Sequence, residues 1–230
     1  MSPTPTHTAI LLFARSARAE AQHKAFGNLN QRRRVSALLN RRAKTLAERT
    51  GLPVYHVDET QQRGDTFATR YQYAFQSLFD QGYDRVVAIG NDCPELSVED
   101  LRSAVAGLEQ YDLVIGPCRQ SGGIYLMGIR RERWLRFATQ DFPWQTRDLQ
   151  QTLIRWTKQM RWSVLQLRPL SDANNLSQLL RAIRLARTLC DYTEILRWLG
   201  MLRTAVRFIK DCIFLTVIPC ASISRRGPPV

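Results

Sequence analysis

Short apolar runs alternate along the chain with longer segments in which apolar residues recur every three or four positions. The short runs predict six β-strands, at Thr8–Ala14, Leu52–Asp58, Arg85–Gly90, Asp112–Gly116, Gly123–Ile129 and Ser163–Leu167. The longer segments predict helices at Arg33–Thr50, at Thr66–Gln81, from Ser97 onward and at Thr146–Met160. This alternation predicts an α/β fold, a three-layer α/β/α sandwich with a mostly parallel sheet.

The segments that follow the predicted strands indicate where a ligand would bind. In a parallel α/β sheet, ligands bind at the carboxyl ends of the strands. Those ends lead here into Arg15–Gly27, Asn91–Pro94 and Pro117–Gly123. We expect the first strand and the Arg85–Gly90 strand to be adjacent and central, with Asp92 within about 15 Å of the Arg15–Gly27 loop.

The pattern changes toward the carboxyl end of the chain. Apolar residues keep a helical spacing from Leu176 to Ala186, and a second amphipathic stretch covers Ile195–Lys210. We therefore expect a main domain at residues 1–183 and a basic, amphipathic helical extension at residues 184–230. Three roles stay open for the extension: packing on the domain, binding an anionic membrane surface or a protein partner, or forming a frayed tail.

The charge of the chain adds a binding preference to this architecture. The net charge is +13, and 29 of the 33 basic residues are arginine, whose planar guanidinium binds phosphate in a bidentate manner. The composition therefore favours anionic partners such as nucleotides or anionic membrane surfaces, and we do not expect nucleic acid as the partner. The alternative is that the arginine bias reflects a GC-rich genome and a solvated surface.

Cysteine use and hydropathy indicate the compartment. The five cysteines are unclustered, form no C-x-x-C pair and are odd in number, which is typical of free thiols in a reducing compartment. The sequence shows no signal peptide and no apolar run of about 20 residues. We expect a cytoplasmic protein, with attachment to the inner membrane face as the alternative location.

The segment Gly90-Asn91-Asp92-Cys93-Pro94 directly follows a predicted buried strand. An aspartate at the carboxyl end of a central strand presents its carboxylate to ligands, and Mg²⁺ or Mn²⁺ binds such hard oxygen atoms together with substrate phosphates. A turn aspartate that bonds to its own backbone has the same spacing, so both interpretations stay open. We do not expect Cys93 to be a nucleophile, because no histidine is placed to activate it.

Three segments together resemble a known family: VVAIGNDCPEL at Val86–Leu96, LVIGPCRQSGGIYLMGI at Leu113–Ile129 and FPWQT at Phe142–Thr146. They are similar to a bacterial glycosyltransferase-like family of the nucleotide-diphospho-sugar transferase superfamily, some members of which are associated with arsenosugar biosynthesis. The resemblance extends over about residues 8–183. It implies a type-A glycosyltransferase fold that binds a nucleotide-sugar at the strand ends, with Mg²⁺ or Mn²⁺ between its phosphates.

The resemblance also implies roles for single residues. Asp92 matches the presumed metal ligand of the family and is therefore the expected catalytic residue, with Asp172 as a second metal ligand. The expected substrate-binding residues are the loop cations, the arginine of a Gly-Asp…Arg segment, the paired glycines and a tryptophan near the acceptor side: Arg15, Arg18, Lys24, Arg70, Gly122, Gly123 and Trp144. The other tryptophans are expected to pack in the core.

Two positions depart from the pattern of the family. Ser121 stands where the family usually has an acidic residue, and the family's Asp-x-Asp resembles Asp172-Ala173-Asn174, in which the second carboxylate is an amide. Neutral oxygen atoms are weaker ligands for a hard cation, so both departures weaken a metal site.

The favoured function is transfer of a sugar from a nucleoside diphosphate-sugar to an acceptor. Two alternatives are a nucleotidyltransferase of the same fold and a non-catalytic nucleotide- or anion-binding protein. Asp92 favours an enzyme, whereas Ser121 and Asn174 favour the binding protein.

Overall fold

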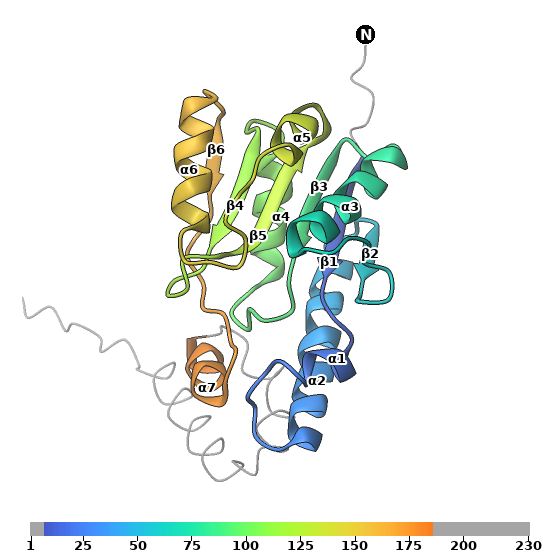
Figure 1. Ribbon diagram of the computed structural model, residues 1–230, viewed down its shortest axis with the longest axis vertical. Coiled ribbons are helices and arrows are strands. Elements are labelled where there is room, and N and C mark those ends of the chain that lie inside the picture. Colours follow the sequence, from blue (N-terminus) through green and yellow to red (C-terminus); the bar gives the residue numbers. More distant parts are fainter. Residues whose placement is uncertain (1–6, 186–230) are drawn as a thin grey trace, which may run out of the picture.

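A computed structural model describes residues 7–185 of the chain, and these form a six-stranded sheet in the order β2-β1-β3-β5-β4-β6 (Figure 1). The strands are β1 (Thr8–Phe13), β2 (Val54–Val57), β3 (Arg85–Ile89), β4 (Leu113–Pro117), β5 (Ile124–Arg130) and β6 (Val164–Gln166). All six predicted strands are present, and β1 and β3 are adjacent as expected, with Ile10 paired to Val87.

The strand β5 departs from the parallel arrangement. It runs antiparallel to both of its neighbours, β3 and β4, while the other strands are parallel to one another. The connection from β4 to β5 covers only residues 118–123. A parallel crossover needs a dozen or more residues, so a connection of this length returns the chain in the opposite direction.

Helices cover both faces of the sheet, which confirms the three-layer sandwich. On one face, alternate strand residues such as Ala9 and Leu11 pack against helices α3 (Phe67–Asp80), α5 (Arg131–Ala138) and α6 (Leu149–Gln159). On the other face, Ile10 and Leu12 pack against α2 (Leu29–Glu48) and α4 (Val98–Gly107). Successive residues of a strand point to opposite faces, and this explains why β1 contributes to both clusters.

The helix boundaries were predicted less well than the strands. α2 begins at Leu29, four residues before the predicted start, because Asn28 and Gln31 form a capping box with reciprocal hydrogen bonds. The helix predicted from Ser97 onward is present as α4, and Ser97 and Asp100 form a capping box at its start. Two of the described helices were not predicted: the short α1 (Ala17–Glu20) inside the Arg15–Gly27 loop, which we call the basic loop, and α5 directly after β5.

A third apolar cluster lies beyond the carboxyl ends of β1 and β3, where Figure 1 shows α1 and α7 (Leu176–Leu185) below the sheet. In this cluster Leu179 and Ile183 of α7 pack against Phe26 and against Val35 of α2. The apolar residues of α7 that pack here therefore lie within the predicted main domain, residues 1–183. The predictions for residues 186–230, and with them the membrane and partner roles, lie outside the described residues. Within residues 7–185, no helix combines the length and apolarity needed to cross a membrane.

Candidate functional site

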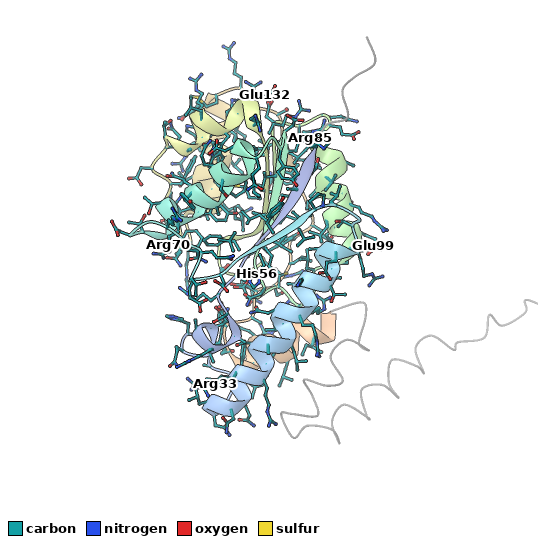
Figure 2. All side chains as sticks on the ribbon, turned by 90° about the vertical axis from the view of Figure 1, so that its right-hand side faces the viewer. Arg33, His56, Arg70, Arg85, Glu99 and Glu132 are labelled. Carbon is teal, nitrogen blue, oxygen red and sulfur yellow. The ribbon has the colours of Figure 1, made fainter. Side chains whose placement is uncertain are left out.

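A cavity of about 760 Å³ opens at the carboxyl ends of β1 and β3. Its lining comes from the basic loop, the β3 end, the loop between β4 and β5, the Trp144 segment and the 172–178 segment. Arg85 at the start of β3 and Arg33 on α2 lie at opposite ends of the molecule, with His56 between them (Figure 2). Two parts of the lining differ in chemistry, and we call them the ionic wall and the aromatic wall.

The ionic wall consists of Arg15, Glu20, Lys24, Asp92 and Asn174, all of which line the cavity. The Lys24 Nζ atom donates hydrogen bonds to Asp92 Oδ2 at 3.3 Å and to Asn174 Oδ1 at 2.5 Å. It also lies 3.6 Å from Glu20 Oε1, and the other oxygen atom of this carboxylate, Oε2, lies 3.8 Å from Arg15 Nη1. The predicted neighbourhood of Asp92 and the basic loop is therefore confirmed, at contact distance.

Backbone hydrogen bonds join the three segments that carry the ionic wall. The amide of Ala173 donates to the Asp92 carbonyl oxygen at 2.8 Å, and the amide of Ala25 donates to the Asn174 carbonyl oxygen at 3.0 Å. Between β1 and β3, the Asn40 side chain of α2 donates to the Arg15 carbonyl oxygen at 2.9 Å and accepts a hydrogen bond from Asn91 Nδ2. These bonds fix the loops that follow β1 and β3 relative to each other.

The aromatic wall consists of Phe67, Tyr71 and Trp144. The rings of Phe67 and Tyr71 are stacked with centroids 5.4 Å apart, and the Trp144 ring lies 5.2 Å from Tyr71 and 5.7 Å from Phe67. Burial raises the pKa of Tyr71, so its hydroxyl stays protonated at neutral pH. The other described tryptophans, Trp134, Trp156 and Trp162, are buried in the core, as predicted.

Two features distinguish the Trp144 segment from the rest of the lining. The indole Nε1 atom of Trp144 is buried and has no hydrogen-bond partner among residues 7–185. The next residue, Gln145, also lines the cavity and has a φ of 62°, a left-handed conformation that is uncommon for a residue with a side chain. Such conformations cluster at functional sites, where the surrounding structure holds them in place.

The remaining predicted residues divide into two groups. Arg70, Gly123 and Asp172 line the cavity, and Asp172 Oδ2 accepts a hydrogen bond from Asn174 Nδ2 at 3.2 Å. Arg18 is exposed, and neither Arg18 nor Gly122 is among the residues that line the cavity. The sharp turn at Gly122, with a φ of 70°, brings its carbonyl oxygen to the amide of Gln150. That glycine therefore ties the loop between β4 and β5 to the start of α6.

Sequence reasoning missed Glu20, Asn40 and Arg147. Arg147 lines the cavity and Asn40 braces it from α2. The i, i+4 spacing of Glu20 and Lys24 was a usable signal, because residues four apart in a helix lie on one face. Asn40 and Arg147 carry no comparable local signal.

The residues present do not form a ready site for a divalent metal. Residues 7–185 contain no group of three or more His, Cys, Asp or Glu side chains that could hold a metal ion. One oxygen atom of each predicted ligand is already engaged, since Asp92 Oδ2 accepts a hydrogen bond from Lys24 and Asp172 Oδ2 accepts one from Asn174. The positive charge of Lys24 Nζ occupies the position between Asp92 and Asn174 where the predicted ion would lie, so this donor set does not fit that ion.

The two described cysteines do not fit a nucleophilic role. Burial, followed by the nearby Asp92 carboxylate, raises the pKa of the Cys93 thiol well above its usual value. Burial and the carboxylates of Asp172 and Asp92 raise the pKa of Cys118 to about 12. Both thiols therefore stay protonated at neutral pH, which agrees with the prediction for Cys93.

Solved structures share this fold. A protein from Desulfovibrio desulfuricans G20, provisionally described as a nucleotide-diphospho-sugar transferase, is 22% identical with a TM-score of 0.66. The match covers 90% of this chain and 98% of that one. Rv0371c from Mycobacterium tuberculosis H37Rv is 12% identical with a TM-score of 0.50, over 78% of this chain and 98% of that one. A manganese complex of Rv0371c is also matched, at 12% identity and a TM-score of 0.42, over 77% and 98%.

Of these likenesses, the one to the Desulfovibrio protein confirms the predicted nucleotide-diphospho-sugar transferase fold, and at such identities the likenesses establish the fold alone. They do not bear on arsenosugar biosynthesis, which stays a resemblance. No curated protein matches the chain significantly. A family model described as "Uncharacterized protein conserved in bacteria (DUF2064)" matches residues 17–146, which is more than half of the sequence. The chain therefore belongs to the DUF2064 family of bacterial proteins.

Proposed function

We propose that the protein is a transferase that binds a nucleoside diphosphate-sugar in this cavity and transfers the sugar to an acceptor. The observation that carries the proposal is the cavity itself, in which arginines and an aromatic wall meet at the carboxyl ends of β1 and β3. Its volume of about 760 Å³ is in the range of small-molecule sites. Ligands of α/β sheets bind at this edge, which further supports the proposal.

The arginines of the cavity match a diphosphate. Arg15, Arg70 and Arg147 reach the lining from three different segments. Arg70 is held at the rim by Nη1, which donates to the carbonyl oxygen atoms of Gly64 and Asp65 at 3.4 and 3.2 Å. A guanidinium has five N–H donors, so an arginine anchored in this way can still bind phosphate through its other nitrogen atoms.

The aromatic wall supplies the complementary surface. Phe67, Tyr71 and Trp144 present flat apolar faces on which a base or a sugar ring can pack. In the proposed reaction the bond between the sugar and the diphosphate breaks, a glycosidic bond to the acceptor forms, and the nucleoside diphosphate leaves.

The metal-ligand roles predicted for Asp92 and Asp172 are not part of this proposal. Both carboxylates accept hydrogen bonds from neighbouring side chains. Asp92 is still 35% exposed in its side chain and faces the cavity. We assign it the role of orienting the bound ligand at the strand ends.

Two loop arginines provide a matched test of this function. Isothermal titration of the full-length chain with a panel of nucleotide-sugars should show binding that weakens about tenfold in Arg15→Ala, equal to about 1.4 kcal/mol. The same change at Arg18, which has the same charge in the same loop but lies outside the lining, should alter the dissociation constant less than twofold.

The products separate the candidate reactions. Release of a nucleoside diphosphate from a nucleotide-sugar supports sugar transfer, whereas release of pyrophosphate from a nucleoside triphosphate supports nucleotidyl transfer. Binding without either product would leave the non-catalytic alternative. If the wild-type chain binds no member of the panel, or if both arginine variants bind equally well, the proposed use of the cavity is wrong.

A further inference from the structure

The ammonium group of Lys24 is enclosed at the floor of the ionic wall. Its Nζ atom donates to Asp92 Oδ2 at 3.3 Å, to the Ala173 carbonyl oxygen at 3.1 Å and to Asn174 Oδ1 at 2.5 Å. The Lys24 side chain is only 7% exposed. An ammonium group has three N–H donors, and here each donor has an acceptor. Lys24 is therefore held in one position, unlike a flexible surface lysine.

This position lies between the aspartate after β3 and the 172–174 segment, where the sequence resemblance implied a divalent cation. A divalent cation bound to the same oxygen atoms would compete with Nζ for their lone pairs. It would also be repelled by the charge of Lys24, in a site where burial weakens the screening by water. The fixed ammonium and a protein-held metal ion therefore exclude each other.

The amide of Asn174 fits an ammonium group better than it fits a metal ion. Its Oδ1 atom accepts from Lys24, while its Nδ2 atom donates to Asp172 Oδ2 at 3.2 Å. An ionised carboxylate at this position would accept hydrogen bonds but could not donate to Asp172. It would also add a negative charge beside Glu20, Asp92 and Asp172. The asparagine thus links the lysine to the second aspartate without adding charge.

We infer that Lys24 takes the place of a divalent cation in this protein, so that the cavity binds its anionic ligand without a metal. The ammonium offsets the charge of Asp92, which would otherwise repel a diphosphate at the end of β3. Direct contacts to the phosphates then fall to the arginines of the cavity, because the three donors of Lys24 are already used. The part of the inference that concerns the ligand rests on the proposed function, whereas the exclusion of metal does not.

The exclusion of metal can be tested with MnCl₂ alone. Thermal unfolding and isothermal titration of the full-length wild-type chain should show no Mn²⁺ binding up to about 1 mM. The double variant Lys24→Met with Asn174→Asp removes the ammonium and adds a carboxylate, so it should bind Mn²⁺ at least tenfold more tightly than wild type. Lys44→Met is the matched control, since Lys44 is an exposed residue of α2 whose ammonium lies 3.8 Å from the exposed Glu48 carboxylate, and it should behave as wild type.

The double variant removes the ammonium partner of the buried Glu20 carboxylate and could fail to fold, so the wild-type measurement must decide by itself. Micromolar Mn²⁺ binding to the wild-type chain without nucleotide would overturn the inference, whatever the variants do. A second variant, Lys24→Arg, keeps the positive charge and should remain insensitive to Mn²⁺. Tight Mn²⁺ binding by this variant would also contradict the inference.

A nucleotide titration separates this inference from the proposed function. With the nucleotide-sugar panel, the wild-type dissociation constant should agree within twofold between buffer with EDTA and buffer with 1 mM MnCl₂. Binding that requires Mn²⁺ would overturn the inference and leave the proposed function intact. Absence of binding under both conditions would defeat the proposed function, and the titration with MnCl₂ alone would still decide whether Lys24 excludes the metal.

Discussion

The two walls of the cavity are built in different ways. The aromatic wall joins Phe67 and Tyr71, which lie one turn apart on α3, to Trp144, and it continues into the apolar core of the same face of the sheet. The ionic wall joins Lys24, Asp92 and Asn174, which come from three loops. The first wall is an extension of core packing, whereas the second depends on hydrogen bonds and charge balance. We therefore expect different substitutions to destabilise the two walls.

The largest expected effect is on the support of the aromatic wall, from Gly122→Ala. A Cβ atom on Gly122 would lie 2.1 Å from the Arg147 carbonyl oxygen, and the φ of 70° is unfavourable for alanine. Displacing the segment that carries Trp144 and Arg147 should lower the free energy of unfolding by about 3 kcal/mol or more. Chemical denaturation followed by tryptophan fluorescence would measure this loss.

Gly51→Ala is the matched control for this change. Gly51 has a similar φ of 78°, but a Cβ atom there would meet no atom within 4 Å. Gly51→Ala should therefore lower the free energy of unfolding only by the backbone cost of about 1 kcal/mol. Equal losses in the two variants would show that the contact with Arg147 does not support the wall.

A smaller effect concerns the ion pair between Arg168 and Asp100 and the dependence of its stabilising effect on pH. Arg168 precedes the 172–174 segment and holds it by two hydrogen bonds to the Asp100 carboxylate, at 2.7 and 2.8 Å. Burial raises the pKa of Asp100, but the bonds from Arg168 and Ser97 outweigh burial and leave the pKa below its usual 3.8. Asp100→Asn should lower the free energy of unfolding by about 1–2 kcal/mol at pH 7. The loss is no larger because Arg168 is partly exposed, so that water screens the ion pair.

The sign of the pH effect follows from the lowered pKa. The stabilisation is fully present above the unfolded pKa near 3.8 and is lost as pH falls through the folded pKa. Urea denaturation between pH 7 and pH 2.5 should therefore show the wild type and Asp100→Asn converging in acid. A difference that stays constant over this range would contradict the assigned ion pair.

The smallest expected effect is a difference in stability between substitutions of two tryptophans, Trp134 and Trp144, which lie on the same face of the sheet. Trp134 Nε1 donates to Gln76 Oε1 at 2.9 Å, whereas Trp144 Nε1 is buried without a partner among the described residues. Trp134→Phe should cost about 1 kcal/mol more than Trp144→Phe, because only the former breaks a hydrogen bond and leaves Gln76 unsatisfied. Thermal unfolding would measure the difference in stability. Equal losses would indicate that the Trp144 indole has a bond within the folded protein.

Much of the fold could be predicted from local patterns. Each strand is an apolar run of a few residues, and each run was located from neighbouring residues alone. The direction of β5 follows from the short 118–123 connection, and the early start of α2 follows from the Asn28 capping box. Both signals are local and were present in the sequence. The resemblance to a family supplied most of the site, and seven of the nine predicted residues line one cavity.

The sequence by itself determined the sandwich, the position of Asp92 after β3 and the arginine-rich loop that follows β1. Only the tertiary structure decided what Lys24 does there. Its partners Asp92 and Asn174 are 68 and 150 residues away along the chain. Periodicity and turn signals act over a few residues, so they cannot specify which distant side chains meet. Lys24 contacts Asp92 and Asn174 only because the sheet brings the ends of β1 and β3 together and α7 packs the 172–174 segment against them.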